Sequence, residues 1–361
     1  MSMEDKKTLL TKAECDALRG IAILGIMLHN FCHLLKFAIK ENEYKFYMER
    51  SQQLADYVAG GMDEMFFIQL MSYFGHYGVP IFVFLSGYGL TLKYEQASKG
   101  AEPTVWNFTR CHYLKLLRMM VPGFVAFVIV DFMTIGPYRY PAENVIALFG
   151  MFANLLPEPN NVIWPGPYWF FGLMMQLYII YRVVLFRRHW GYVVALIAVC
   201  WLLQECCVPD GDALNYLRYN FVGGMLPFGA GMLVARFLYL SPSGASRWHW
   251  LFRCVLLSIA VVAGCFSFQT WLWVPIAVIF AAVCLVKSLP RMLLEKMVWF
   301  GSISAAMFVI HPVARKIFIP ISRRGDVYDG LLLYFISAVA LAWLTKLVID
   351  KIANPSMNKK G

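Results

Sequence analysis

Apolar residues run along the chain in blocks that are long enough to cross a bilayer, and short polar segments separate them. A hydrocarbon core of about 30 Å is crossed by about 20 apolar residues in a helix. On this pattern we place ten membrane-spanning helices, at residues 17–37, 66–92, 114–135, 167–186, 190–208, 219–238, 251–268, 270–287, 297–318 and 329–350. The sequence therefore predicts an all-α, polytopic membrane bundle of about ten transmembrane helices, with residues 1–361 forming a single domain.

Two segments between these blocks do not have the pattern of a membrane-spanning helix. Residues 38–65 alternate in charge and predict a surface helix on the outer side. Within residues 137–166, the apolar piece "ENVIALFGMFANLLP" is too short to cross comfortably, so it predicts a re-entrant or interfacial helix at the outer face.

Composition and charge support a membrane location. The chain is 60% hydrophobic and 15% charged, against about half and about a quarter in soluble domains. Its net charge of +10 is explained by topology, because roughly 22 of the 32 Lys and Arg fall in inner segments when the N-terminus is inside. We therefore expect a multi-pass protein of the plasma (inner) membrane, with both termini cytoplasmic, the lipid bilayer around it and no nucleic-acid partner. The nine cysteines lie mostly in apolar blocks and predict neither a disulfide framework nor a metal site.

The first predicted helix carries more polar groups than lipid tolerates without a reason. Its sequence "LRGIAILGIMLHNFCHLLK" contains Arg19, His29, Asn30 and His33, which share one sector at about 100° per residue. Arg19 is expected near the cytoplasmic interface and His29 about 15 Å deeper, close to the bilayer midplane. A lone buried histidine often only bonds a neighbouring helix. A stripe of ionisable groups more often marks a pathway or a reaction centre.

Imidazole suits a reaction centre because it accepts and returns a proton near neutral pH. We therefore predict His29, with Asn30 and His33, as the catalytic group. In the third predicted helix, Lys115 and Arg118 lie three residues apart at the cytoplasmic end. The positive-inside rule explains such residues, but together with Arg19 they also suit a phosphate group.

Other polar positions admit both a structural and a functional role. Ser86 and Gly87 could allow close approach of another helix or of a ligand, with Tyr88 beside them. Trp169 is expected as an aromatic anchor at the outer interface. Gln176 needs a buried partner, and the first-helix stripe is a candidate.

His311 precedes Pro312, which is expected to kink the ninth predicted helix. The histidine itself can serve packing or catalysis. We group Tyr88, Trp169, Gln176 and His311 as expected substrate or structural support.

Six stretches, in this order, resemble the acyltransferase-3 family of integral membrane O- and N-acyltransferases. They are "LRGIAILGIMLHN", "VPIFVFLSGYGL", "YLKLLRMMVP", "GPYWFFGLMMQLY", "LPFGAGMLVAR" and "GSISAAMFVIHP". The resemblance implies a ten-helix bundle that transfers an acyl group other than an aminoacyl group. The donor is often acetyl-coenzyme A, and the acceptor is a hydroxyl or amine of a sugar, glycan or lipid-linked molecule, as in O-acetylation of cell-envelope polysaccharide.

The family's first-helix Arg and His map to Arg19 and His29, and its third-helix basic pair maps to Lys115 and Arg118. Its Ser-Gly motif maps to residues 86–87. Acyl-CoA is implied as a donor substrate, with no permanently bound cofactor. The family commonly spaces its Arg and His by 11 positions, whereas Asn30 stands there in this chain, so either His29 or His33 serves as the base.

The sequence thus predicts a membrane acyltransferase in which His29 deprotonates the acceptor and Lys115, Arg118 and Arg19 hold the donor phosphates. Asn30, Ser86 or Gln176 is expected to stabilise the oxyanion. A transporter or flippase that uses the same stripe is the alternative, and heparan-type or other small-membrane acyltransferases are a closer one. The acceptor, the acyl chain length and the oligomeric state stay open.

Overall fold

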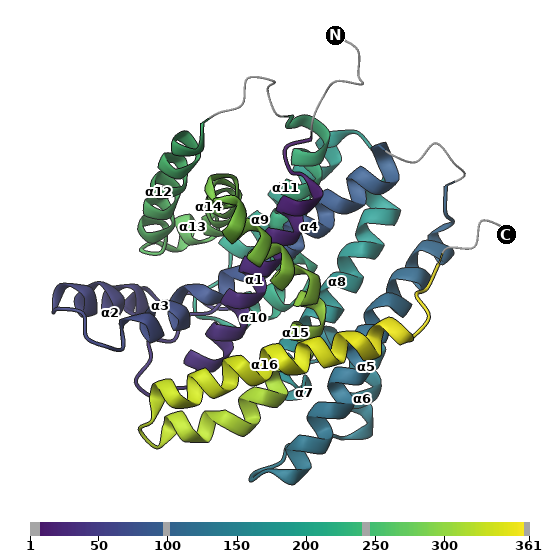
Figure 1. Ribbon diagram of the computed structural model, residues 1–361. Helices are drawn as coiled ribbons and strands as arrows, with labels where there is room; N and C mark the ends of the chain where they lie inside the picture. The colour runs from purple at the N-terminus through teal and green to yellow at the C-terminus, as the bar shows by residue number, and fades with distance from the viewer. Residues whose placement is uncertain (1–7, 97–101, 240–245, 357–361) are drawn as a thin grey trace.

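The computed structural model describes residues 8–96, 102–239 and 246–356, and this part of the chain is helical and contains no strand (Figure 1). The longer helices are α1 (Lys12–Cys32), α2 (Met48–Ala59), α3 (Phe66–Phe74), α4 (Gly78–Thr91), α5 (Val105–Met133), α6 (Ala142–Phe149), α8 (Trp169–Ile180), α9 (Trp190–Glu205), α10 (Asp212–Tyr219), α11 (Phe221–Phe237), α12 (Arg247–Gly264), α14 (Val274–Ser288), α15 (Arg291–Arg323) and α16 (Val327–Lys351). Short helical turns connect them, namely η2 (Gly75–Tyr77), η3 (Leu92–Gln96), η4 (Ala153–Leu155), α7 (Pro159–Val162), η5 (Gly166–Tyr168), η6 (Tyr181–Leu185) and α13 (Phe268–Trp271).

The described helices confirm the predicted polytopic bundle. Seven segments are long and apolar enough to cross a membrane, namely those that contain α1, α3–α4, α5, α8, α12, α15 and α16. Three shorter apolar helices, α9, α11 and α14, lie at the other predicted spans. The surface helix expected within residues 38–65 is α2, and the short apolar piece before residue 157 forms α6 and η4.

The first helix begins and ends about five residues earlier than the predicted span of 17–37. Thr11 caps its first turn, because its hydroxyl accepts a hydrogen bond from the Glu14 amide while the Glu14 side chain bonds back. The helix ends at Cys32, and tight turns follow it. His29 therefore lies in the last turn of α1 and His33 is the C-terminal cap of the helix.

Helix α1 packs against α15, α3, η2, α4 and α14, and α15 also packs against α5 and α16 (Figure 1). Glycines allow the backbones of α1 and α15 to touch. A Cβ at Gly301 would lie 1.9 Å from the carbonyl oxygen of Asp16, and a Cβ at Gly20 would lie 2.1 Å from that of Met297. Small residues at helix crossings serve this purpose in membranes.

The second crossing is broken at its middle. Helix α3 gives way to the 3-10 turn η2 and continues as α4. At this break Gly75 touches α1 so closely that a Cβ would lie 2.5 Å from the Gly25 carbonyl oxygen and 2.7 Å from the Cβ of His29. The break therefore brings His76, the next residue, directly beside the end of α1. Broken helices within membranes are tolerated where protein buries them or where they line a cavity.

Helix α15 continues through Pro312 to Arg323, five residues beyond the predicted end of the span at residue 318. A proline removes one backbone hydrogen bond, but it does not stop a helix whose neighbours hold it on both sides. Here α1, α5 and α16 pack along α15. The uninterrupted helix carries Arg315 one turn beyond His311, toward the end of α1.

Candidate active site

Three cavities adjoin one another through the bundle. The first, here named the outer cavity, has a volume of about 200 Å³ and contains His29, Asn30 and His33 of α1 together with His76 of η2 and Arg315 of α15. Its remaining wall comes from the segment between α1 and α2 and from α1, α4, η5, α8, α10 and α15. The residues are Ile26, Asn42, Glu43, Tyr44, Val79, Gly166, Pro167, Trp169, Phe170, Tyr219 and Phe308. The fold thus gathers the predicted catalytic residues with two that the sequence did not single out.

The three imidazoles form one cluster. The ring of His29 lies 4.8 Å from that of His33 and 5.3 Å from that of His76, measured between centroids. His29 and His76 are buried. Among the described residues, neither ring nitrogen of His76 and neither the His29 nor the His33 Nδ1 atom has a hydrogen-bond partner. Buried polar atoms without partners are costly, so this cluster is suited to a ligand or ordered water.

Arg315 and Asn30 form the polar wall beside the imidazoles. A guanidinium N–H of Arg315 donates to the Asn30 side-chain oxygen over 3.0 Å, while the Asn30 amide donates to the Ile26 carbonyl over 2.9 Å. No carboxylate pairs with Arg315 within the described part of the chain. A cation in a cavity without a counter-ion favours an anion or a developing negative charge.

Arg19 and Ser86 lie in a middle cavity of about 190 Å³ rather than beside His29. Phe170 and Phe308 line both this cavity and the outer one, with 5.2 Å between their ring centroids. The Ser86 hydroxyl donates to the Phe82 carbonyl one turn earlier. The two aromatic rings therefore form the boundary between the predicted donor residues and the imidazole cluster.

Lys115 and Arg118 line the third and largest cavity, of about 430 Å³. Lys346 and Asp350 of α16 face the same space. The Arg118 Nε–H donates to the Ile349 carbonyl over 3.0 Å, which fixes the guanidinium against α16. Four residues line this cavity and the middle one alike, namely Leu116, Met119, Tyr178 and Ala305. The series of cavities therefore leads from a basic mouth to the imidazole cluster.

Comparison with known protein families identifies the family of this chain. A family model described as an acyltransferase domain matches residues 12–347, nearly the whole chain. The chain belongs to the acyltransferase-3 family. It is therefore a multi-pass membrane acyltransferase, and the resemblance seen in its sequence motifs is confirmed. No curated protein and no solved structure matches it.

Several residues predicted for the site of this acyltransferase lie elsewhere. Gln176 bonds the Asn220 side chain over 2.7 Å and the Phe221 amide over 2.8 Å, so its predicted pairing with the first-helix stripe is wrong. Asn220 is the residue before α11. The first backbone amides of a helix have no partner within the helix, and the Gln176 side chain accepts a hydrogen bond from one of them, the Phe221 amide. Gly87 approaches the Phe228 carbonyl of α11, where a Cβ would lie 2.1 Å away, so close approach at this glycine serves helix packing.

Three further predicted residues are buried in different surroundings. The Tyr88 hydroxyl accepts from the Leu10 amide, which ties α4 to the segment before α1. Trp169 is not an interfacial anchor, because Tyr44 and Tyr219 cover it and it lines the outer cavity. His311 is fully buried, with its Nδ1 atom 3.1 Å from the Met307 carbonyl oxygen.

His76, Arg315 and Lys346 belong to the cavities of the acyltransferase although sequence reasoning missed them. A signal existed for two of them. His76 lies between Gly75 and Gly78, a spacing of glycines typical of a broken and closely packed helix. Arg315 follows His311 by four residues and so shares its helix face.

Two carboxyl groups of the segment between α1 and α2 lie next to this site. Burial raises the pKa of Glu43, which lines the outer cavity, to about 7, although the Arg218 guanidinium beside it opposes the shift. Burial likewise raises the pKa of Glu41 to about 8 against the opposing charge of Arg50. In the part of the chain that the structure describes, no group of three His, Cys, Asp or Glu side chains is arranged to hold a metal ion.

Proposed function

We propose that this acyltransferase moves an acyl group, acetyl in the first instance, from acyl-CoA to a hydroxyl or amine of a glycan, sugar or lipid-linked acceptor of the cell envelope. The observation that carries the proposal is the series of three adjoining cavities with cations at one end and imidazoles at the other. We place the protein in the plasma (inner) membrane with both termini in the cytoplasm, because its Lys and Arg follow the positive-inside rule.

The donor enters at the basic mouth. Lys115 and Arg118 provide two cations for the coenzyme A phosphates, and Lys346, which is ion-paired with Asp350 over 2.7 Å, provides a third. Such cations recognise phosphate in proteins generally. The thioester arm then follows the middle cavity past Arg19 and reaches the boundary formed by Phe170 and Phe308. The outer cavity of about 200 Å³ must hold both the acyl group and the reacting part of the acceptor, which favours a short acyl group.

The reaction is a single acyl transfer with His29 as general base. A ring nitrogen of His29 takes the proton of the acceptor hydroxyl or amine, and the acceptor atom forms a bond to the thioester carbonyl carbon. The tetrahedral adduct then loses coenzyme A as the carbon–sulfur bond breaks. The imidazolium returns its proton to the leaving thiolate, so the base is regenerated.

Negative charge develops on the carbonyl oxygen during this step. Arg315 lines the same cavity as His29 and has no carboxylate partner within the described residues, so it is suited to stabilise that charge. Its contact with Asn30 gives the asparagine a role in holding the guanidinium. Ser86 and Gln176, the other predicted stabilisers, lie outside the outer cavity.

A binding experiment separates this function from transport. Acetyl-CoA should raise the thermal midpoint of the purified protein, because a ligand that binds only the folded state stabilises it. Lys115→Ala should reduce the rise. Arg110→Ala, an exposed position on the same helix, should keep it. Indifference of the wild-type protein to acetyl-CoA would favour a transporter and reject the proposal.

The acceptor is identified in cells. Mass spectrometry of envelope glycans and lipids should show an acyl group that is present with the wild-type gene and absent without it. Complementation with Arg110→Ala should restore the modification, and complementation with His29→Ala should not. An unchanged set of acyl groups in cells that lack the gene would contradict the proposed acceptor class.

A further inference from the structure

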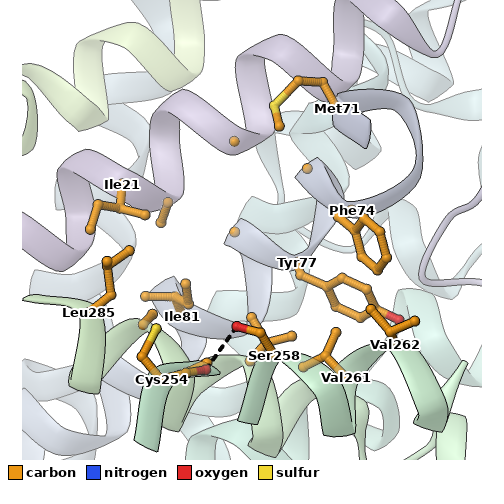
Figure 2. Close-up of a pocket in the computed structure, with 17 residues that line it drawn as sticks. Ile21, Met71, Phe74, Tyr77, Ile81, Cys254, Ser258, Val261, Val262 and Leu285 are labelled. Carbon is orange, nitrogen blue, oxygen red and sulfur yellow. Dashed lines mark hydrogen bonds between the residues drawn. The ribbon is translucent and has the colours of Figure 1, made fainter. Parts of the chain in front are cut away.

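A fourth pocket, of about 380 Å³, lies apart from the three cavities of the proposed reaction. It is enclosed by α12 and α14 on one side and by α1, α3, η2 and α4 on the other. Figure 2 shows Ile21 of α1, Leu285 of α14 and Cys254 of α12 around it.

The pocket offers no free polar group to a ligand. Its lining is almost wholly aliphatic and aromatic, and two hydroxyls are the exceptions. The Ser258 hydroxyl donates to the Cys254 carbonyl over 2.9 Å, and the Tyr77 hydroxyl lies 3.8 Å from the Cys265 sulfur. An apolar space of this kind does not hold water. Its occupant must be a hydrocarbon whose polar part lies elsewhere.

The mouth of the pocket faces the bilayer. Helix α12 is long and apolar enough to span a membrane, and very little of it is buried in the protein. Ser258 and Val262 line the pocket and are exposed, while Ile259 beside them is exposed on the helix surface outside the lining. In a bilayer these exposed positions meet lipid chains, so a chain can enter sideways without crossing a polar surface.

The pocket is elongated along the helices. On α12 it extends from Cys254 to Val262, eight helical steps that span about 12 Å at 1.5 Å per residue. One leaflet contributes about 15 Å to a hydrocarbon core of about 30 Å. The dimensions therefore match a chain that lies within one leaflet, parallel to the helices.

We propose that this pocket binds one hydrocarbon chain of a bilayer phospholipid, inserted between α12 and the bundle. Phospholipid is the occupant because it surrounds α12 on its exposed side. The bound chain lies against Gly25 and Gly75, which line the pocket. Gly75 is next to the imidazole cluster, because a Cβ on it would lie 2.7 Å from the Cβ of His29. Occupation of this pocket requires no step of the proposed acyl transfer.

Photolabelling tests the proposal directly. The full-length protein is reconstituted with a phosphatidylcholine that carries a diazirine in mid-chain, and labelled peptides are mapped by mass spectrometry. Labelling should concentrate on the pocket-lining stretches of α12 and α14. Ser258→Trp places an indole at the mouth, so labelling of the α14 stretch should fall several-fold. Ile259→Trp, the neighbouring exposed position, should leave it unchanged.

A second variant and a second readout keep the result decisive. Ala281→Phe fills the pocket from α14 and should reduce labelling in the same way. Added phospholipid should raise the thermal midpoint of the detergent-purified wild type and of Ile259→Trp, and it should raise that of the filled variants less. Labelling that is spread uniformly along α12 in every variant would overturn the proposal. Cross-links between two copies of the protein that Ser258→Trp abolishes would also overturn it, because a second copy would then occupy the pocket.

Discussion

The ring of His76 lies edge-on to the ring of His29, with 5.3 Å between their centroids, although the two residues are on different helical segments. The contact depends on the break at η2 and on the absence of a side chain at Gly75. A break that leaves two buried imidazole nitrogens without protein partners is costly, and such costs are most often found at functional sites.

His29→Ala should reduce acyl transfer by about 10²- to 10⁴-fold, the usual contribution of a general base. The measurement is release of free coenzyme A thiol in the presence of acceptor. His249→Ala, an exposed histidine of α12, is the matched control and should keep wild-type turnover. Full turnover by a folded His29→Ala protein would show that His29 is not the general base, and that role would then be assigned to His33.

His76 acts on the reaction through His29, so its substitution should change turnover rather than donor binding. We expect His76→Gln to lower kcat about tenfold, which corresponds to about 1.4 kcal/mol, with KM for acetyl-CoA unchanged. The pH profile of kcat should also shift, because the substitution replaces an imidazole that can bind a proton with an amide that cannot. This changes the electrostatic interactions with the neighbouring groups, which are His29, His33, Arg218 and Arg315. A merely structural role predicts loss of folded protein with an unaltered pH profile in what remains.

Phe308 stands between the middle and outer cavities, so its size should control passage of the thioester. Phe308→Trp should leave the acetyl-CoA dissociation constant within about twofold of wild type but abolish transfer to acceptor, since the phosphate site is remote. Isothermal calorimetry and the thiol-release assay separate the two effects. Phe266→Trp, an exposed phenylalanine outside these cavities, is the control. Equal loss of binding and transfer would show that the donor takes another route.

The sequence predicts the crossings well because bilayer thickness fixes the length of an apolar helix. All ten predicted spans have a helix in the structure, and the family motifs that mark Arg19, His29 and Lys115 are local in sequence. These residues also line the adjoining cavities. Local pattern was therefore enough to find one polar group for each cavity.

The contacts between helices were not predictable from the same pattern. Gln176 pairs with Asn220 rather than with α1 because the start of α11 needs partners for its amides, a demand that appears only when the helices are packed. His76 and Arg315 were missed for a related reason. Each is an isolated polar residue in an apolar run, and only the break at η2 and the unbroken helix α15 bring them to the end of α1.

Gly301 should be among the least tolerant positions of the bundle. A Cβ there would lie 1.9 Å from the Asp16 carbonyl oxygen, so Gly301→Ala must separate α1 from α15 and should destabilise the protein by several kcal/mol, about the size of the largest single-residue effects. Gly89→Ala is the matched control, because nothing lies within 4 Å of its added Cβ. That control should be neutral or slightly stabilising. Thermal midpoints of the two purified variants make the comparison, and equal midpoints would disprove the tight crossing.

Glu41 should make the stability of the protein fall as the pH rises. Burial raises its pKa from an ordinary value of 4.5 to about 8, against the opposing charge of Arg50 at 3.8 Å. The folded state therefore holds this proton more tightly than the unfolded state does. Stability is greatest below about pH 4.5 for this group and declines until about pH 8, by at most about 1.4 kcal/mol per pH unit.

Glu41→Gln removes this titration, so its thermal midpoint should depend less on pH than that of the wild type. Glu43, whose pKa burial raises to about 7, still titrates in the variant and adds its own decline below that pH. The clearest difference should therefore lie between pH 7 and 8, where Glu41 titrates after Glu43. Glu49→Gln, an exposed position on α2, is the control and should follow the wild type. Parallel curves for the wild type and Glu41→Gln would mean that Glu41 is already ionised in the folded protein at neutral pH, held by Arg50.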